Sequence, residues 1–221
     1  MIITAHGGSL GTGRNTYRYF GKMTGYKVDA IEVDIMKRGK ILYLAHVVPA
    51  LFARRAIPLS YVFEYCKKHN VMVNCDVKRK GLVKPVLELA KEMGAEQFIY
   101  FTGSVYHKEI DNLDGGIAYV NTSFYKRKFP LCLENLEKIK EYLDSFKNPR
   151  IKGINIPYRY ASNEFVKKAK EIGLGLSIYT VDDAALLERL IPLCPDNITT
   201  NRIDLALALR GACDQNNEDR E

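Results

Sequence analysis

Two histidines and two carboxylates stand at the ends of short apolar runs near the start of this chain. His6 ends the first run, Glu32 and Asp34 lie at the end of the second, and His46 follows a third. Because imidazole titrates near neutral pH, two histidines can share the acid and base roles of one reaction. Glu32 and Asp34 are two residues apart on a predicted strand, so their side chains share a face. Together the four residues suit metal-assisted acid–base chemistry.

A third carboxylate and a lysine follow on the next predicted strand. Two carboxylates in one site repel each other unless a cation or protons neutralise them, and Asp76 can add a third oxygen donor. Such ligands suit a hard divalent ion, Mg²⁺ or Ca²⁺. Lys78 points to the same side as Asp76 and can hold an anionic phosphate. Two plainer alternatives stay open: Glu32 and Asp34 pair with Arg or Lys or face solvent, and Lys78 forms a salt bridge to Asp76 or Asp34.

Residues 7–13 form a glycine-rich loop directly after His6. The backbone N–H groups of such a loop, ahead of a helix, can cradle a phosphate. Glycine also serves any tight turn, so the loop by itself is compatible with both roles.

Short apolar, β-branched runs alternate with segments of helical periodicity, which predicts a parallel sheet with helical crossovers. The eighth predicted strand has no neighbour left except the first, so closure into a (βα)8 TIM barrel is the simplest architecture, with an open doubly wound sheet as the alternative. The C-terminal ends of barrel strands form the active face, and the candidate residues fall at or just past such ends. The predicted strands are Ile2–Ala5, Ala30–Ile35, Met72–Val77, Gln97–Phe101, Gly116–Val120, Ile151–Ile156, Gly175–Tyr179 and Asp196–Thr199.

One segment departs from this alternation. A polar stretch, residues 36–40, follows the second strand, and a second apolar run, Ile41–Ala45, comes directly before His46. This pattern predicts a short hairpin-like extension instead of a helix. Such an extension would bend His46 back toward the mouth of the barrel.

Length and composition are typical of one domain. The chain has 221 residues, 47% of them apolar, which is enough for one sizeable core. A (βα)8 barrel usually takes about 250 residues, so this one would be trimmed. We predict a single barrel domain over residues 1–210 and a polar, flexible tail over residues 211–221.

Several other classes of protein are not favoured. No stretch of 18 or more apolar residues occurs, so we expect no membrane span, and the N-terminal residues do not form a secretory signal. The five cysteines are odd in number and have no CxxC spacing, which indicates reduced thiols and a cytoplasmic location. The net charge of +7 is spread along the chain without a nucleic-acid motif, so we expect no nucleic-acid partner. Nothing in the sequence indicates an oligomeric state.

The motifs of the chain, taken in order, are similar to those of a known family. The first four stretches are His6-Gly7-Gly8, Arg14-Asn15-Thr16, Glu32-Val33-Asp34 and His46-Val47. The later three are Asn74-Cys75-Asp76-Val77-Lys78, Tyr179-Thr180-Val181-Asp182 and Thr200-Asn201-Arg202. In this order they resemble the His-Arg-Gly, Glu-Asn-Thr, Glu-x-Asp, His-Asp, Asn-x-Glu-x-Lys, Trp-Thr-Val-Asn and Thr-Asp-Arg/Lys motifs of the glycerophosphodiester phosphodiesterase family.

The resemblance implies a βα barrel that hydrolyses a small phosphodiester to an alcohol and a phosphomonoester with a divalent metal ion. By position, it implies a catalytic pair at His6 and His46, metal ligands at Glu32, Asp34 and Asp76, a phosphate-binding Lys78, and an aromatic wall of the substrate cleft at Tyr179.

The chain departs from the family motifs at several positions. The Arg after the first His is Gly7, the Asp after the second His is Val47, and the Asp of the last motif is Asn201. The third metal-binding Glu is Asp76, which is one methylene shorter. The Glu before Asn-Thr is Arg14, which can restore the lost positive charge and bind substrate from a different position.

These departures motivate a second hypothesis, a catalytically impaired relative that binds phosphodiesters or phosphate-containing ligands. Loss of one charged contact to a transferring phosphate can slow a reaction by about 10²–10³-fold. Both histidines and all three carboxylates are present, however, which favours the enzyme. A barrel of other chemistry, with an accidental resemblance, is the third alternative.

Overall fold

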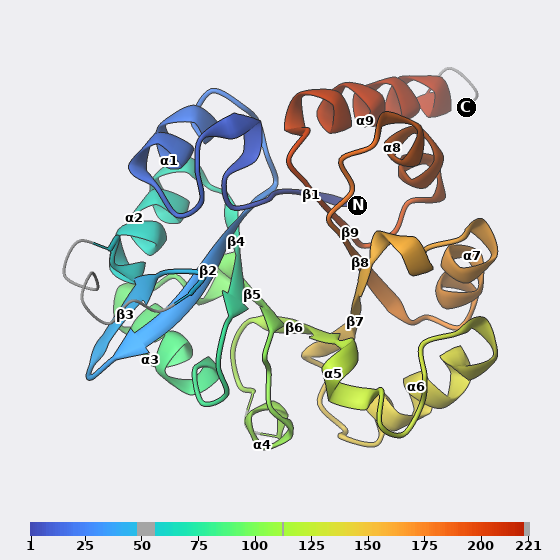
Figure 1. The fold of residues 1–221 in the computed structure, drawn as a ribbon, viewed down its shortest axis with the longest axis horizontal. Coiled ribbons are helices and arrows are strands. Elements are labelled where there is room, and N and C mark those ends of the chain that lie inside the picture. Colours follow the sequence, from blue (N-terminus) through green and yellow to red (C-terminus); the bar gives the residue numbers. More distant parts are fainter. Residues whose placement is uncertain (48–55, 112, 219–221) are drawn as a thin grey trace.

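The chain folds into a closed barrel, as Figure 1 shows. The structure is a computed structural model that describes residues 1–47, 56–111 and 113–218. β1 pairs with β9 on one side and with β2 on the other, so the ring of eight parallel strands is complete. The predicted barrel is confirmed, and the open sheet is wrong. The strands of the ring are β1 (Ile2–Ala5), β2 (Ala30–Arg38), β4 (Met72–Val77), β5 (Ile99–Gly103), β6 (Ile117–Asn121), β7 (Ile151–Pro157), β8 (Gly175–Tyr179) and β9 (Asn197–Thr200).

Helices cover the outside of the ring (Figure 1). Polar side chains cap several of them: Thr16 accepts from the Tyr19 amide, and Ser162 accepts from the Phe165 amide, both at 3.2 Å. The helices are α1 (Tyr17–Met23), α2 (Leu59–His69), α3 (Val83–Met93), α4 (His107–Ile110), α5 (Thr122–Tyr125), α6 (Leu136–Asp144), α7 (Asn163–Glu171), α8 (Ala184–Leu190) and α9 (Ile203–Glu218). Among its described residues, the connection from β5 to β6 carries only the four-residue helix α4, which is one place where the barrel is trimmed.

A ninth strand, β3 (Ile41–Leu44), extends β2 beyond the ring as an antiparallel hairpin. The turn passes through Gly39, whose φ of +59° suits glycine. After β3 the Ala45 amide donates to the Asp34 carbonyl at 3.0 Å, which brings the chain back to the end of β2. The predicted extension is confirmed. The following segment, residues 48–55, lies outside the described residues.

The apolar core lies mainly between the strands and the helices, and it includes the fully buried Phe20, Phe63 and Phe101. Inside the ring, Ala30, Tyr100 and Tyr119 form a separate buried cluster near the N-terminal ends of their strands. Burial of these side chains is the main source of stability.

Polar side chains also fill part of the interior of the ring. Thr4 donates to Asn197 Oδ1 at 2.6 Å, and Thr102 donates to Asn74 Oδ1 at 2.8 Å. All four side chains are buried, so these hydrogen bonds offset the cost of removing polar groups from water. A polar interior of this kind forms the floor of the mouth.

Helix α9 packs against β1 on the outside of the barrel. Arg210 on α9 forms an ion pair with Asp29, and the same carboxylate oxygen accepts from the Ile3 amide at 2.8 Å. The helix continues past Gly211, where we expected the polar tail to begin, and it includes residues up to Glu218. The domain boundary at residue 210 and the flexibility of the tail stay predictions. Across the described residues, no helix has both the length and the apolar character needed to cross a bilayer.

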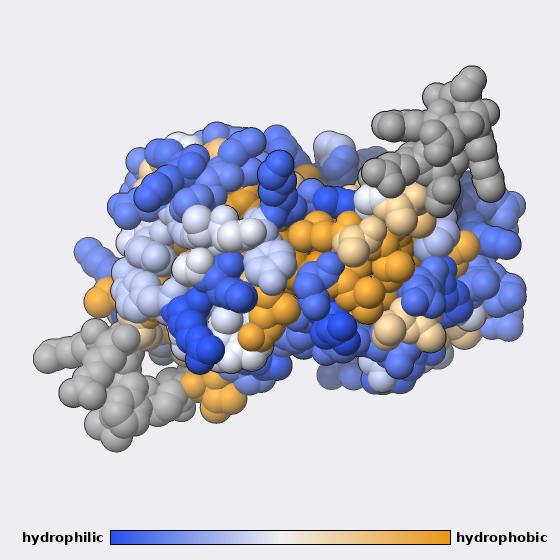
Figure 2. Space-filling model, turned by 90° about the horizontal axis from the view of Figure 1, so that it is seen from above, coloured by the Kyte–Doolittle hydropathy of each residue, from blue (hydrophilic) through white to orange (hydrophobic). Residues whose placement is uncertain are grey.

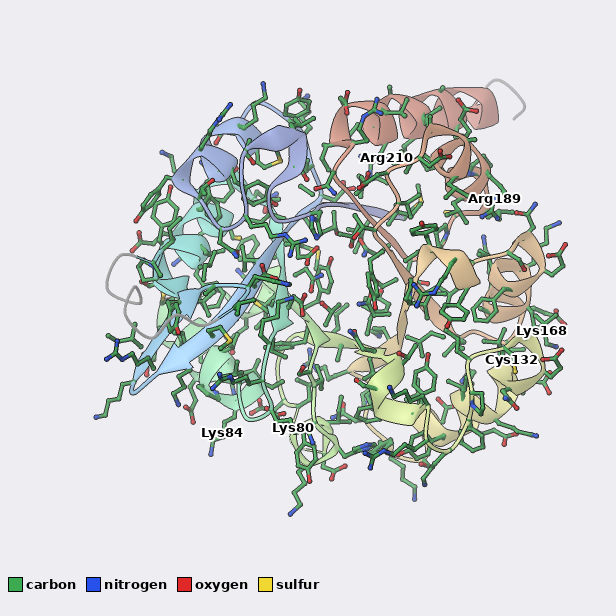
Figure 3. All side chains as sticks on the ribbon, in the orientation of Figure 1. Lys80, Lys84, Cys132, Lys168, Arg189 and Arg210 are labelled. Carbon is green, nitrogen blue, oxygen red and sulfur yellow. The ribbon has the colours of Figure 1, made fainter. Side chains whose placement is uncertain are left out.

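The outer surface has both apolar and hydrophilic regions. Figure 2 shows apolar surface at the centre of the face seen from above, surrounded by hydrophilic residues. Figure 3 shows Lys84, Lys168, Arg189 and Arg210 on four different helices around the ring. The positive charge is therefore distributed around the barrel, as the sequence predicted.

Candidate active site

Three carboxylates meet at the C-terminal ends of β2 and β4. Strand alternation turns Glu32 and Asp34 to the inside of the ring, and the parallel register places Asp34 beside Asp76. One carboxylate oxygen from each residue lies within 4.8 Å of the others. Glu32 is 8% exposed and Asp34 is 4% exposed. Three acidic groups are therefore held close together with little access to water.

This cluster has the donor chemistry of a divalent-cation site. Two oxygens that bind one ion with bonds of about 2.4 Å are at most about 4.8 Å apart, so the three oxygens are close enough to share an ion. Burial, followed by the charges of Asp76 and Asp34, raises the pKa of Glu32 well above its usual range. A cation would offset this repulsion. The all-oxygen set therefore fits a hard ion of the Mg²⁺ or Ca²⁺ type.

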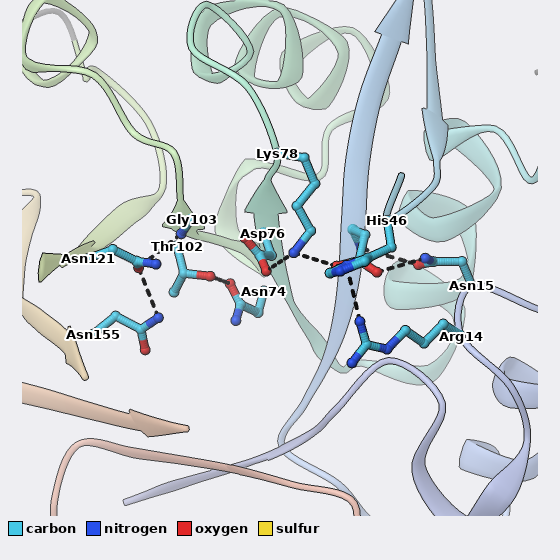
Figure 4. A network of polar contacts seen from close by, with 11 residues as sticks. Arg14, Asn15, His46, Asn74, Asp76, Lys78, Thr102, Gly103, Asn121 and Asn155 are labelled. Atoms are coloured by element: carbon cyan, nitrogen blue, oxygen red, sulfur yellow. Dashed lines mark hydrogen bonds and ion pairs between the residues drawn. The ribbon is translucent and has the colours of Figure 1, made fainter. Parts of the chain in front are cut away.

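Lys78 supplies positive charge to the cluster. Its ammonium donates to Asp34 Oδ1 at 2.6 Å and also to Asp76 Oδ2 (Figure 4). Burial acts to lower the pKa of Lys78, but the two carboxylates outweigh burial and raise it. Burial acts to raise the pKa of Asp34, but the charge and hydrogen bond of Lys78, with further hydrogen bonds, reverse the shift and lower it. The salt-bridge alternative for Lys78 is confirmed, with both aspartates as partners.

Asn15 holds the Asp34 carboxylate from the loop before α1. Its Nδ2 donates to Asp34 Oδ2 at 2.9 Å, and its Oδ1 accepts from the Asp34 amide at 3.1 Å. Asn15 has a φ of +53°, in the left-handed region that asparagine enters more readily than most residues. From the sequence, Asn15 was expected to cap the first helix together with Thr16, and Thr16 is the N-cap. The contact of Asn15 with Asp34 was not expected, and the family-like motif was the available signal for it.

His46 returns to the mouth at the end of the hairpin, as predicted. Its Nδ1 lies 3.3 Å from Asp34 Oδ1 and 3.1 Å from Arg14 Nη1. One ring nitrogen serves one of these partners at a time: with a proton it donates to Asp34, and without a proton it accepts from Arg14. The side chain of His46 is 49% exposed, so solvent and small molecules can reach it.

His6 lies at the end of β1 on the same strand face as Thr4, which points into the ring. The His6 amide donates to the Thr200 carbonyl at 2.9 Å, and its ring Nδ1 lies 3.0 Å from Asn201 Oδ1. Burial lowers the pKa of His6. The hydrogen bond to Asn201 opposes this shift, and the charge of Arg14 adds to it. The neutral imidazole is therefore favoured.

Tyr179 ends β8 and is half-buried. Burial raises the pKa of Tyr179, and the charge of Asp76 raises it further, whereas Arg159 lowers it. Tyr179 therefore lies within electrostatic reach of the carboxylates, in the place that the resemblance gives to an aromatic wall.

Polar side chains of β6 and β7 continue the rim of the mouth (Figure 4). The Gly103 amide and Asn155 Nδ2 donate to Asn121 Oδ1 at 3.1 and 3.0 Å. Asn155 Oδ1 and the hydroxyl of Tyr125 are buried, and neither has a hydrogen-bond partner in the described parts of the chain. Gly103 packs so closely that a Cβ there would lie 2.1 Å from an oxygen of Asp76. No motif marked these residues in the sequence.

The glycine-rich loop forms tight turns. Gly8, Gly11 and Gly13 have φ values of +115°, +69° and +84°, which L side chains rarely adopt. Ser9 Oγ lies 2.7 Å from the His6 carbonyl, which ties the loop to the end of β1. These observations support the tight-turn alternative, and phosphate binding by the loop stays a prediction.

The residues predicted from the sequence lie at or beside the C-terminal mouth of the barrel. A continuous set of contacts joins Asp34, Asp76, Lys78, His46 and Arg14, and Glu32 lies close to the two aspartates. His6 has its own partner in Asn201. The full predicted set is His6, Arg14, Glu32, Asp34, His46, Asp76, Lys78 and Tyr179.

Comparisons by sequence identify no relative: no protein-family model and no curated protein matches the chain. Comparison of structures finds proteins with the same fold. A glycerophosphodiester phosphodiesterase from Parabacteroides distasonis superposes with a TM-score of 0.72 at 15% identity, over 96% of this chain and 97% of that chain. A phosphodiesterase from Oleispira antarctica, solved with its product sn-glycerol-3-phosphate, gives 0.72 at 14% identity over 95% and 96%.

The same fold also carries other chemistry. A phosphoribosyl anthranilate isomerase from Thermococcus kodakaraensis superposes with a lower TM-score of 0.54, at 14% identity, over 94% of this chain and 97% of that chain. Fold alone therefore does not assign an activity, which has to be argued from the site. The chain is a (βα)8 barrel with the fold of several solved glycerophosphodiester phosphodiesterases, the family that its motifs resemble.

Proposed function

We propose that this protein hydrolyses a small glycerophosphodiester-type phosphodiester to an alcohol and a phosphomonoester, with a divalent metal ion and two histidines as acid and base. One observation carries the proposal: an oxygen-only cluster fit for a hard cation lies at the same barrel mouth as His6, His46 and Lys78. The structural neighbours named for this activity support it.

Glu32, Asp34 and Asp76 would hold the metal ion. When bound, the ion would stabilise the negative charge that develops on the phosphate. Lys78 now bonds two of the same carboxylates. A divalent cation would compete with it for them and leave its ammonium to a phosphate oxygen.

The two histidines would move the protons. One removes a proton from the nucleophile, which is water or a neighbouring hydroxyl of the substrate, and the other protonates the leaving alkoxide. Arg14, which lies at the His46 ring, would bind the phosphate in place of the arginine that Gly7 replaces in the motif. Tyr179 would line the substrate cleft.

The second hypothesis, a binding protein without turnover, rests on Gly7, Val47 and Asn201. Val47 in particular is 72% exposed and apolar where the family motif has an acid. Release of alcohol from a panel of glycerophosphodiesters separates the two hypotheses. It is measured with Mg²⁺, with Ca²⁺ and with a chelator, for the wild type, for His46→Ala and for the control His69→Ala.

Metal-dependent release that is lost in His46→Ala and retained in His69→Ala supports the enzyme. His69 suits the control because it ends α2 just before β4 begins, at the end of the barrel opposite the mouth, where its ring centroid lies 4.4 Å from that of Tyr65. Folded protein that releases no alcohol with either metal contradicts the enzyme and favours the binding protein. Titration with glycerol phosphate then tests the binding hypothesis.

A further inference from the structure

A chain of hydrogen bonds leads from Asp182 through Asn201 to His6. Asp182 follows β8. Its Oδ1 accepts from the backbone N–H of Asn201 at 2.7 Å, and its Oδ2 accepts from the side-chain Nδ2 of Asn201 at 2.8 Å. Thr200 Oγ1 also lies 3.3 Å from Asp182 Oδ1. Asn201 Oδ1 in turn lies 3.0 Å from His6 Nδ1.

The chemistry of these groups decides the direction of each hydrogen bond. An ionised carboxylate only accepts, so the side of Asn201 that faces Asp182 has to be its NH₂ group. The oxygen of Asn201 is therefore turned toward His6. An amide oxygen also only accepts, so His6 Nδ1 has to carry the proton. In a neutral imidazole this leaves Nε2 without a proton.

We propose that Asp182 and Asn201 are positioning residues that hold His6 in the Nδ1–H tautomer, so that Nε2 is the proton acceptor and His6 is the general base. This inference rests on the function proposed above and deepens it, because it divides the acid and base roles between the two histidines. His46 is then the group that protonates the leaving alkoxide.

Two further observations support this assignment. Burial keeps His6 neutral, as a base has to be before it acts. The two residue types are also exchanged relative to the family-like motifs, which have Asn at position 182 and Asp at position 201. The chain retains one carboxylate and one amide, but the amide, not the carboxylate, touches His6.

The tautomer is measured by NMR, independently of turnover. Selective ¹⁵N labelling of the four histidines reports which ring nitrogen carries the proton, and the variant His6→Gln identifies the His6 signals. We expect Nδ1–H in the wild type near neutral pH. In Asp182→Asn no carboxylate fixes the orientation of the Asn201 side-chain amide, so we expect an altered or mixed tautomer of His6. Asp182→Asn/Asn201→Asp places a carboxylate beside His6 and should restore Nδ1–H.

Kinetics follow the same set of variants. We expect kcat to fall by about 10–10²-fold in Asp182→Asn with a small change in KM, since only the proton transfer is affected, and to recover in the double variant. The control Asp204→Asn, an exposed aspartate beside Arg202 on α9, should change neither kcat nor the tautomer.

A wild-type His6 with its proton on Nε2 overturns the proposal, and so does a tautomer that is unchanged in Asp182→Asn. The expected tautomers without any turnover in the wild type would contradict the proposed function alone and leave the positioning roles standing. Because the wild-type tautomer needs only the assignment of the His6 signals, an Asp182 or Asn201 variant that fails to fold does not prevent the test.

Discussion

Gly103 is the residue whose substitution tests the geometry of the metal cluster most directly. It ends β5 with a φ of +86°, and a Cβ there would lie 2.1 Å from Asp76 Oδ1 and 2.5 Å from the Val77 carbonyl oxygen. Ordinary contacts of this kind begin at 3.4 Å, so the Asp76 oxygen would have to move by about 1.3 Å. Metal–ligand distances tolerate only about 0.2 Å. Gly103→Ala should therefore displace one of the three predicted ligands.

Gly81 provides a matched control. Its φ of +82° is nearly the same, but a Cβ there would have no atom within 4 Å. Gly81→Ala should cost only the strain of a left-handed alanine, about 1–2 kcal/mol in the free energy of unfolding. Gly103→Ala should cost that amount and about 1–3 kcal/mol more, because the clash with Val77 forces β4 and β5 apart.

Metal affinity distinguishes the two variants. Mg²⁺ and Ca²⁺ binding is measured by calorimetry, and unfolding by denaturant titration. We expect metal binding to weaken by about 10–100-fold in Gly103→Ala, as when supporting groups of a metal site are lost, and to stay near the wild-type value in Gly81→Ala. Equal affinities in the two folded variants would refute the reasoning, since they would mean that Asp76 is not a ligand or that it moves without effect.

Three other predictions concern single groups. Lys78→Met removes the cation between Asp34 and Asp76, so the metal-free protein should lose about 1–3 kcal/mol in the free energy of unfolding, measured by denaturant titration. Adding Mg²⁺ or Ca²⁺ should stabilise this variant more than it stabilises the wild type. A metal-free variant as stable as the metal-free wild type would contradict this. Tyr125→Phe removes a buried hydroxyl that has no partner in the described residues, so the free energy of unfolding should stay the same or rise by up to about 1 kcal/mol; a drop larger than that would show that the hydroxyl is hydrogen-bonded. Burial and then Lys128 lower the pKa of His107 below 6.5, so the unfolded chain binds its proton at a higher pH than the folded chain. This contribution to stability is complete above pH 6.5 and decreases as the pH falls toward the folded pKa. His107→Gln should therefore show a smaller loss of stability than the wild type over that pH range, and equal losses would exclude His107 as the cause.

The strands were predictable because each is a short apolar run between turn signals. β1, β4 and β8 have the predicted bounds, whereas β5 begins at Ile99 instead of Gln97 because Glu96–Phe98 forms a 3-10 turn. The hairpin after β2 was predictable from the same kind of pattern. The closure of the barrel was predictable from the alternation of strands and helices, since the last predicted strand had no neighbour left except the first.

The contacts inside the site were not predictable in the same way. Lys78 had several candidate partners within reach, and only the folded register of β2 and β4 shows that it bonds both aspartates. The amide of Asn201 is oriented by Asp182, 19 residues away, and Gly103 is tied to Asp76 only through packing. Such relations depend on distances between strands, which residue types and spacing do not contain.

The pairing of β1 with β9 has a consequence for how the protein is made. His6 directly follows the first strand, and Asn201, its partner, comes 195 residues later. During synthesis on a ribosome, the base of the proposed reaction therefore emerges 195 residues before the residue that orients it. A partly synthesised chain has a gap in the ring where β9 belongs and exposes two unpaired strand edges, which favour association with other chains. Completion of the ring removes both edges and assembles the site in the same event.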